Sequence, residues 1–155
     1  QKKLEVSSAY SALEALDALI ITMSLLVDSE KKILEEQFLQ CFKQLAPYCE
    51  NNTLIVVETS MPVGFSRNKI VPAFESMGKK HGKDFLLVHS PERIKSGTML
   101  QQLASIPKII GGVTEQASDR AFDLYSSFFP KELLQKVASI EAAELVKLAG
   151  MIYRT

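Results

Sequence analysis

The stretch TLIVVETS, residues 53–60, decides the fold. It opens with a run of apolar and β-branched residues without polar alternation, so the strand that it predicts must be covered on both faces. Strands of this kind belong to parallel sheets that carry helices on each side. The stretch therefore predicts a central strand of an α/β layered fold, with Thr59 and Ser60 at its carboxyl end.

The pattern of this strand recurs along the chain and alternates with helical periodicity. Further strands are predicted at 4–6, 18–23, 84–90, 107–112 and 132–139. Helices are predicted at 9–16, at 66–78 and from Ser139 to the end. Two more are predicted to start at Asp28, continuing through Phe38 and Leu45, and at Thr114, with Tyr125 and Phe128 facing inward. The helix at 66–78 is expected to bend at Pro72 and to end at Gly78. This alternation predicts a Rossmann-like parallel sheet, whose ligands lie beyond the carboxyl ends of the strands.

Composition excludes several classes of function. The 155 residues suit one domain, and 18 basic residues balance 18 acidic ones, which argues against nucleic acid or an anionic membrane surface as a partner. The sequence has no apolar run of membrane-spanning length, and its first ten residues lack the apolar core of a signal peptide, which favours the cytoplasm. Cys41 and Cys49 match no zinc spacing, so we interpret both as packed thiols and expect no metal.

Polar residues follow the predicted strands. In HSPERIKSG, residues 89–97, Glu92 is either a base whose pKa is raised by burial or an exposed acid paired with Arg93. The hydroxyls of ETS either bind a ligand or water, or satisfy their own backbone in a turn. GGVT, residues 111–114, is either a turn from strand to helix or a weak anion site at a helix start.

The last predicted helix has a polar side with Glu144, Lys147, Met151 and Arg154. Its other side carries Leu145, Leu148, Ala149 and Ile152. The polar side is either a solvated stripe or part of a cleft, in which case a buried lysine would stabilise a developing oxyanion.

Four segments in order carry a family resemblance: VVETSMPVGFSRNKIVPAFE, HSPERIKSG, IPKIIGGVT and SIEAAELVKLAGMIYR. Together they resemble the UDP-glucose/GDP-mannose dehydrogenase family of NAD-dependent nucleotide-sugar 6-dehydrogenases. The SPER motif is similar to that of the branch acting on UDP-N-acetylhexosamines. The resemblance covers nearly the whole chain.

The resemblance implies oxidation of a sugar CH2OH to a carboxylate with two NAD, through a cysteine thioester that is then hydrolysed. In this family Ser60 would replace a threonine that orients water near the nicotinamide, and Glu92 would be the general base of the hydrolysis. The backbone of Arg93, Ile94 and Lys95 would line the sugar-nucleotide site. Lys147 would stabilise the oxyanion.

The sequence also departs from the family pattern. It contains neither the GxGxxG turn with its ribose-binding acid nor the segment with the nucleophilic cysteine. Leu25 replaces a threonine that contacts NAD, and Met151 replaces a substrate-site asparagine whose amide hydrogen bonds a thioether cannot donate. We therefore expect an incomplete Rossmann-like sheet that lacks the first mononucleotide-binding half. Residues 1–138 would be the partial NAD-binding domain and residues 139–155 the start of the connecting helix.

Three interpretations follow. The chain is a fragment of a UDP-sugar dehydrogenase, or a catalytically inactive relative that serves as a binding or assembly module, or a different Rossmann-like dehydrogenase. The last would be favoured if Glu92 and Lys147 lay far apart. We expect the chain alone to bind NAD weakly and to leave UDP-sugars unoxidised, and we expect an unpaired strand to favour a homo-oligomer.

Overall fold

A computed structural model of the protein describes residues 5–93 and 105–153. In this part of the chain five strands form one sheet in the order β1-β2-β3-β4-β5. Their bounds are β1 Ala18–Ile21, β2 Thr53–Val57, β3 Phe85–His89, β4 Lys108–Gly112 and β5 Leu134–Lys136. The stretch that predicted the fold is the second strand, with Leu54 paired to Ala18 on one side and to Leu86 on the other.

The direction of β4 corrects the prediction of a wholly parallel sheet. Strands β1, β2 and β3 are parallel, and β4 and β5 are parallel to each other, but β4 runs antiparallel to β3. The pairing is short and joins Val88 to Gly112 and His89 to Gly111. The cause is that β4 begins beside the carboxyl end of β3, where the Ser90 hydroxyl donates to the Ile109 carbonyl at 2.8 Å. A strand that begins there runs back along its neighbour.

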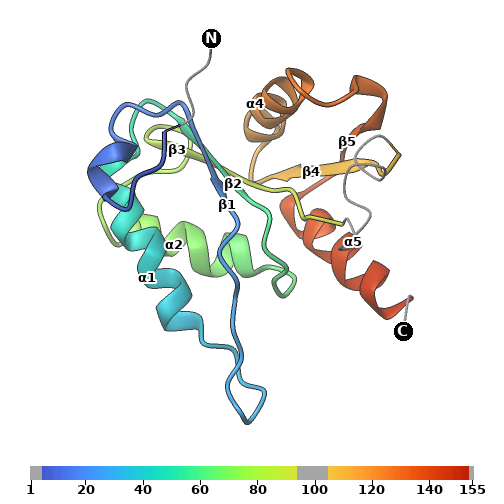
Figure 1. Ribbon diagram of the computed structural model, residues 1–155, viewed down its shortest axis with the longest axis horizontal. Coiled ribbons are helices and arrows are strands. Elements are labelled where there is room, and N and C mark those ends of the chain that lie inside the picture. Colours follow the sequence, from blue (N-terminus) through green and yellow to red (C-terminus); the bar gives the residue numbers. More distant parts are fainter. Residues whose placement is uncertain (1–4, 94–104, 154–155) are drawn as a thin grey trace.

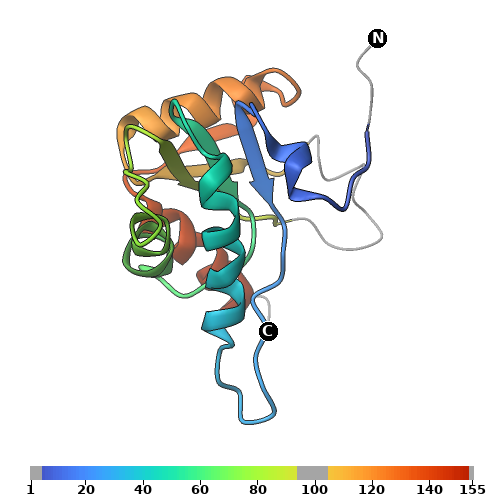
Figure 2. The same ribbon diagram turned by 90° about the vertical axis from the view of Figure 1, so that its left-hand side faces the viewer.

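Helices cover both faces of the sheet, as the two-sided apolar strands require (Figures 1 and 2). They are α1 Glu35–Leu45, α2 Val71–Glu75, α4 Glu115–Ser126 and α5 Ile140–Ile152. On one face Ile55, Val57 and Leu87 pack with residues of α1, α2 and α5. On the other face Val56 and Leu86 pack against α4.

Capping residues explain where some helices begin. The hydroxyls of Thr114 and Ser139 accept hydrogen bonds from the Ala117 and Ala142 amides, as predicted. Asp28 does not cap α1, which begins at Glu35. Its carboxylate instead accepts from the backbone of a turn in the loop after β1. The capping preference of aspartate also applies to turns, which accounts for the wrong prediction.

Other predicted elements are shorter or absent. Val6 is 90% exposed and belongs to no strand, and the predicted first helix is a single 3-10 turn, η1 Tyr10–Leu13. The helix predicted at 66–78 divides at its proline into a π-helical turn, η3 Ser66–Ile70, followed by α2. Phe128, predicted inward, is 57% exposed beyond the end of α4.

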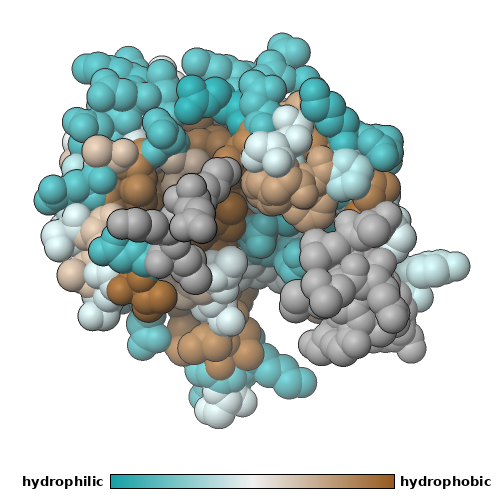
Figure 3. Space-filling view, turned by 45° about the horizontal axis from the view of Figure 1, so that its top comes forward, coloured by the Kyte–Doolittle hydropathy of each residue, from teal (hydrophilic) through white to brown (hydrophobic). Residues whose placement is uncertain are grey.

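The surface has an uneven distribution of apolar residues. On the face shown in Figure 3, hydrophilic side chains lie along the top of the molecule and apolar ones gather nearer the middle. Within α5, Leu145 and Ile152 are 54% and 76% exposed. None of the helices in the described ranges is both long and apolar enough to cross a membrane.

Candidate active site

The chain leaves β3 as a short lip, residues 90–93, whose backbone continues the pairing with the end of β2. The Ser90 amide donates to the Val57 carbonyl at 3.0 Å, and the Glu92 amide donates to the Glu58 carbonyl at 3.2 Å. Ser90 and Pro91 are buried, whereas the Glu92 side chain is exposed. The lip therefore holds an acid at a fixed place on the edge of the sheet.

Lys147 reaches this lip from α5. Its ammonium group donates a hydrogen bond to the backbone carbonyl of Glu92. The side chain of Arg93 donates to the Pro107 carbonyl at 3.4 Å, and a cavity of about 20 Å³ is lined by Arg93, Lys147, Gly150 and Met151. Lys147 therefore meets the backbone of Glu92, whereas the Glu92 carboxylate accepts from the Arg93 amide at 2.6 Å, and Met151 lies beside Lys147. That the Glu92 and Lys147 side chains share one crevice stays a prediction.

Ser60 and Leu25 belong to a second part of the same sheet edge, at the exits of β2 and β1. The Thr59 hydroxyl donates to the Met23 carbonyl and joins these two exits. Ser60 is half-buried next to it, and Leu25 packs against the hydrophobic core beneath α1. Ile94 and Lys95 lie outside the described residues. The structure thus groups the predicted residues into a lip at β3 and a pair at β1 and β2.

A buried ion pair next to the lip was not predicted. Lys108 at the start of β4 and Glu58 at the end of β2 are joined at 2.5 Å, with side chains 7% and 16% exposed. The Tyr125 hydroxyl donates to the same Glu58 oxygen at 2.7 Å, and the Lys108 ammonium lies 5.0 Å from the Tyr125 ring centroid. Burial, together with Glu58, raises the pKa of Tyr125. Each of these two apolar strands has a charged residue at one end, and that is the signal that could have found this pair, because a charge buried there needs a partner.

Glu144 corrects the interpretation of the last helix as a solvated stripe. Its side chain is fully buried, and its two carboxylate oxygens accept from the Gly64 amide at 2.5 Å and the Ser66 amide at 2.9 Å. One turn earlier Glu141 pairs with Arg67 at 2.5 Å, and this hydrogen bond holds the pKa of Glu141 at about 2. The polar side of α5 faces the protein because its acids satisfy backbone amides and a guanidinium there.

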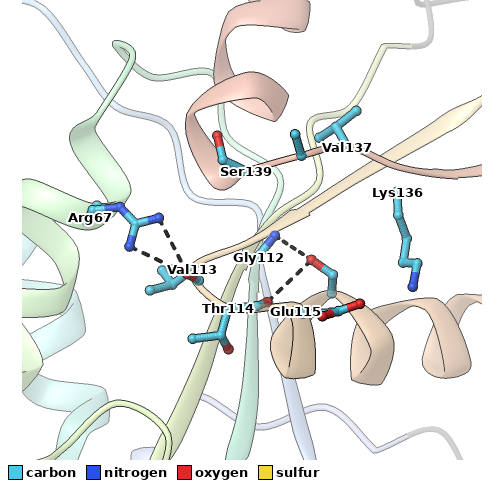
Figure 4. A pocket seen from close by; sticks show the side chains of 10 residues that line it. Arg67, Gly112, Val113, Thr114, Glu115, Lys136, Val137 and Ser139 are labelled. Carbon is cyan, nitrogen blue, oxygen red and sulfur yellow. Dashed lines mark hydrogen bonds between the residues drawn. The ribbon is translucent and has the colours of Figure 1, made fainter.

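A cavity of about 300 Å³, shown in Figure 4, is lined by none of the lip residues 90–93. Its lining includes Arg67, Thr114, Lys136 and Ser139. The GGVT segment passes through it as a turn from β4 into α4, and the Gly112 amide already donates to the Ser118 hydroxyl at 2.9 Å. Both cations on its wall are paired with acids, Arg67 with Glu141 and Lys136 with Asp119. The turn interpretation of GGVT is therefore the better one.

The two cysteines pack as the sequence predicted. Cys49 is fully buried, its thiol donates to the Leu45 carbonyl at 3.5 Å, and burial raises its pKa to about 11. Cys41 is half-buried and its pKa is also raised by burial. Neither thiol has the lowered pKa of a nucleophile. In the described ranges no three side chains of the metal-binding types come together.

His89, the last residue of β3, holds a buried imidazole below the lip. Its side chain is fully buried, and within residues 5–93 and 105–153 neither ring nitrogen has a hydrogen-bond partner. Burial, and then the nearby Lys108 and Lys147 ammonium groups, lower the pKa of His89 to about 4. The Val57 carbonyl opposes this shift without reaching hydrogen-bond geometry. The ring is therefore neutral at pH 7.

We expect His89 to lower the free energy of unfolding by about 2 kcal/mol between pH 7.5 and pH 5. The unfolded imidazole binds a proton near pH 6.5, whereas the folded one does so only near pH 4. The contribution of this group to stability is therefore complete above pH 6.5 and is lost as the pH falls toward 4. Urea unfolding at the two pH values measures the effect in the wild type and in His89→Leu. The control His81→Gln should keep the loss of about 2 kcal/mol that is due to His89. If His89→Leu lost as much unfolding free energy between pH 7.5 and pH 5 as the wild type, the prediction would be contradicted.

Comparison with known sequences identifies the family to which this sheet edge belongs. The pattern of the NAD binding domain of the UDP-glucose/GDP-mannose dehydrogenase family matches residues 1–129. The chain belongs to the UDP-glucose/GDP-mannose dehydrogenase family. The residues that match the family's NAD binding domain include strands β1 to β4 and helix α4, while β5 and α5 follow them in the chain.

Individual members of the UDP-glucose/GDP-mannose dehydrogenase family agree with this assignment. A UDP-N-acetyl-D-mannosamine dehydrogenase of Methanocaldococcus jannaschii is 30% identical over 129 residues, which is 82% of this chain and 28% of the relative. Protein CapL of Staphylococcus aureus is 28% identical over 94% of this chain and 34% of its own length. The structure of a UDP-D-ManNAc dehydrogenase from Pyrococcus horikoshii has a TM-score of 0.87 at 26% identity, over 97% of this chain and 35% of that one. The chain spans about a third of these relatives.

Proposed function

We propose that this chain is part of an NAD-dependent nucleotide-sugar 6-dehydrogenase that oxidises a UDP-N-acetylhexosamine to its uronic acid in polysaccharide biosynthesis. Two relatives whose names specify a UDP-N-acetylmannosamine dehydrogenase support the substrate class. The observation that carries the proposal is the hydrogen bond from Lys147 to the Glu92 carbonyl. It joins two positions that the family resemblance assigns to the same hydrolysis.

In this proposal each residue of the crevice has one task. The exposed Glu92 carboxylate accepts a proton from the water that attacks the thioester, and the Lys147 ammonium stabilises the oxyanion that forms. The backbone of residues 93–95 lines the sugar-nucleotide side. Ser60 orients water from the exit of β2, since its hydroxyl both donates and accepts. Met151 completes the wall beside Lys147 without donating a hydrogen bond.

NAD supplies the hydride acceptor of the family's reaction when it is bound. The exits of β1 and β2 would face it, and there Leu25 offers an apolar side chain packed on the core while Ser60 offers one hydroxyl. The residues at these exits form no glycine-rich turn that would hold a pyrophosphate. We therefore propose weak NAD affinity for the chain on its own.

The test is a titration of the ¹⁵N-labelled chain with UDP-N-acetylmannosamine, followed by amide resonances. We expect shifts confined to residues around Glu92, Arg93 and Lys147, and no formation of NADH when NAD is added. Glu92→Gln should leave binding nearly unchanged because the proposed site holds the substrate through the lip backbone, whereas Lys147→Met should move the same resonances before ligand is added. Shifts elsewhere, or none at millimolar ligand, would contradict the proposed substrate site. Formation of NADH would contradict the expected inactivity of the isolated chain.

A second candidate function is an inactive relative that acts as a binding or assembly module. The replacements at Leu25 and Met151 favour it, because both remove hydrogen-bonding groups that the family resemblance places beside cofactor and substrate. A homo-oligomer would suit either function. Exposed Leu145 and Ile152 on α5, and Ile20 on the edge strand β1, are the surfaces that we propose for it. We also propose that residues 1–138 form a partial NAD-binding domain and that residues 139–155 begin the connecting helix. The proposed location is the cytoplasm.

A further inference from the structure

One side of α5 makes three contacts at intervals of about one turn, two with the segment 64–67 and one with the lip. Glu141 pairs with Arg67, Glu144 accepts from the amides of Gly64 and Ser66, and Lys147 donates to the carbonyl of the lip. Residues three apart on a helix lie above one another and are separated by about 4.5 Å along its axis. The helix therefore spans the distance from the exit of β2 to the exit of β3.

The three contacts differ in how firmly they fix the helix. The side chains of Arg67 and Glu141 are 43% and 29% exposed, so water and salt weaken their attraction. The Glu144 side chain is fully buried and uses both oxygens. A buried carboxylate that loses its donors is strongly penalised, so this contact tolerates little displacement.

The segment 64–66, whose amides bind Glu144, follows Ser60 closely in the chain. Only the loop 61–63 separates Ser60 from Gly64, and Gly64 has a positive φ of 85° that sets the direction of this loop. A Cβ atom at Gly64 would lie 2.9 Å from the side-chain Nδ2 of Asn68, and the positive φ would strain any other residue there. Glu144 thus fixes the path of the β2 exit relative to α5.

We infer that Glu144 is a positioning residue of the crevice, which holds α5 against the exit of β2 and thereby sets where the Lys147 ammonium meets the lip. The role of this lip in sugar-nucleotide chemistry rests on the proposed function. The contacts of Glu144 and Lys147 do not depend on that proposal, because they are made by residues of this chain alone. Lys147 is half-buried on a flexible stem, so the helix axis decides which carbonyl its ammonium reaches.

The experiment compares amide spectra of the full ¹⁵N-labelled chain in four forms without ligand: wild type, Glu144→Gln, Lys147→Met and the double variant. We expect Glu144→Gln to move the Glu92 and Arg93 resonances in the direction that Lys147→Met moves them. The double variant should match Lys147→Met at these resonances, since Glu144 acts through Lys147. A purely structural carboxylate would instead give additive shifts.

Glu141→Gln is the matched control, because it removes an acid one turn away on the same side of α5 and should leave the lip resonances in place. Hydrogen exchange of the Gly64 and Ser66 amides should accelerate about tenfold or more in Glu144→Gln and stay unchanged in Glu141→Gln. If Glu144→Gln fails to fold, Glu144→Asp retains the charge but is one methylene shorter, and it should shift the lip resonances in the same direction. A folded Glu144 variant with unmoved lip resonances would overturn the inference. A chain that binds no UDP-sugar would overturn the proposed function alone.

Discussion

Replacing Lys108 by methionine is expected to lower the free energy of unfolding by about 3 to 5 kcal/mol. The variant keeps an apolar side chain of similar length but leaves the Glu58 carboxylate, 16% exposed, without its cation. The Tyr125 hydroxyl would remain as its hydrogen-bond donor within this cluster. Because most of the cost is that of a buried charge without its counterion, the loss should appear as a lower urea midpoint with an unchanged slope.

Two further variants separate this explanation from simple loss of packing. The double variant Lys108→Met with Glu58→Gln should be more stable than Lys108→Met alone, because it removes the uncompensated charge. Lys32→Met is the exposed control, since Lys32 pairs with Glu30 at the surface with side chains 74% and 70% exposed. That change should alter stability by less than about 0.5 kcal/mol. If Lys108→Met unfolded at the wild-type midpoint, the pair would have no net role in stability.

The sequence predicted the layers of this fold better than the direction of its strands. TLIVV had to be buried on both faces, and that requirement alone predicted helices on each side of the sheet. The apolar pattern of β4 is equally clear, yet a pattern contains no information about which way its neighbour runs. The antiparallel pairing of His89 with Gly111 depends on where the chain re-enters the sheet after the lip.

The site was partly predictable for a similar reason. Glu92 and Lys147 were brought together by their resemblance to a family, and in the structure the Lys147 ammonium contacts the backbone carbonyl of Glu92. Glu144 was misjudged because α5 is apolar on much of its surface, so helical periodicity does not decide which side meets the sheet. The pairing of Glu58 with Lys108 joins residues far apart in sequence, and no local pattern encodes such a contact.

Gly111→Ala is expected to destabilise the protein by about 3 kcal/mol, because the space for a side chain is already filled. A Cβ atom at Gly111 would lie 2.5 Å from the Ser139 carbonyl oxygen, 2.7 Å from the Ala143 Cβ and 3.1 Å from a methyl group of Val137. Two of these belong to the cap and first turn of α5, so the helix would have to move away from β4. Thermal unfolding measures the loss.

Gly150→Ala is the matched control on the same helix. A Cβ atom there meets no atom within 4 Å, so the change should stabilise α5 by up to about 1 kcal/mol through helix propensity. Gly150→Ala should therefore raise the unfolding temperature, whereas Gly111→Ala should lower it. Since α5 also carries Lys147, Gly111→Ala should in addition shift the Glu92 and Arg93 amide resonances of the folded protein. Equal stability of the two variants would mean that α5 does not pack against β4 through the bare backbone of Gly111.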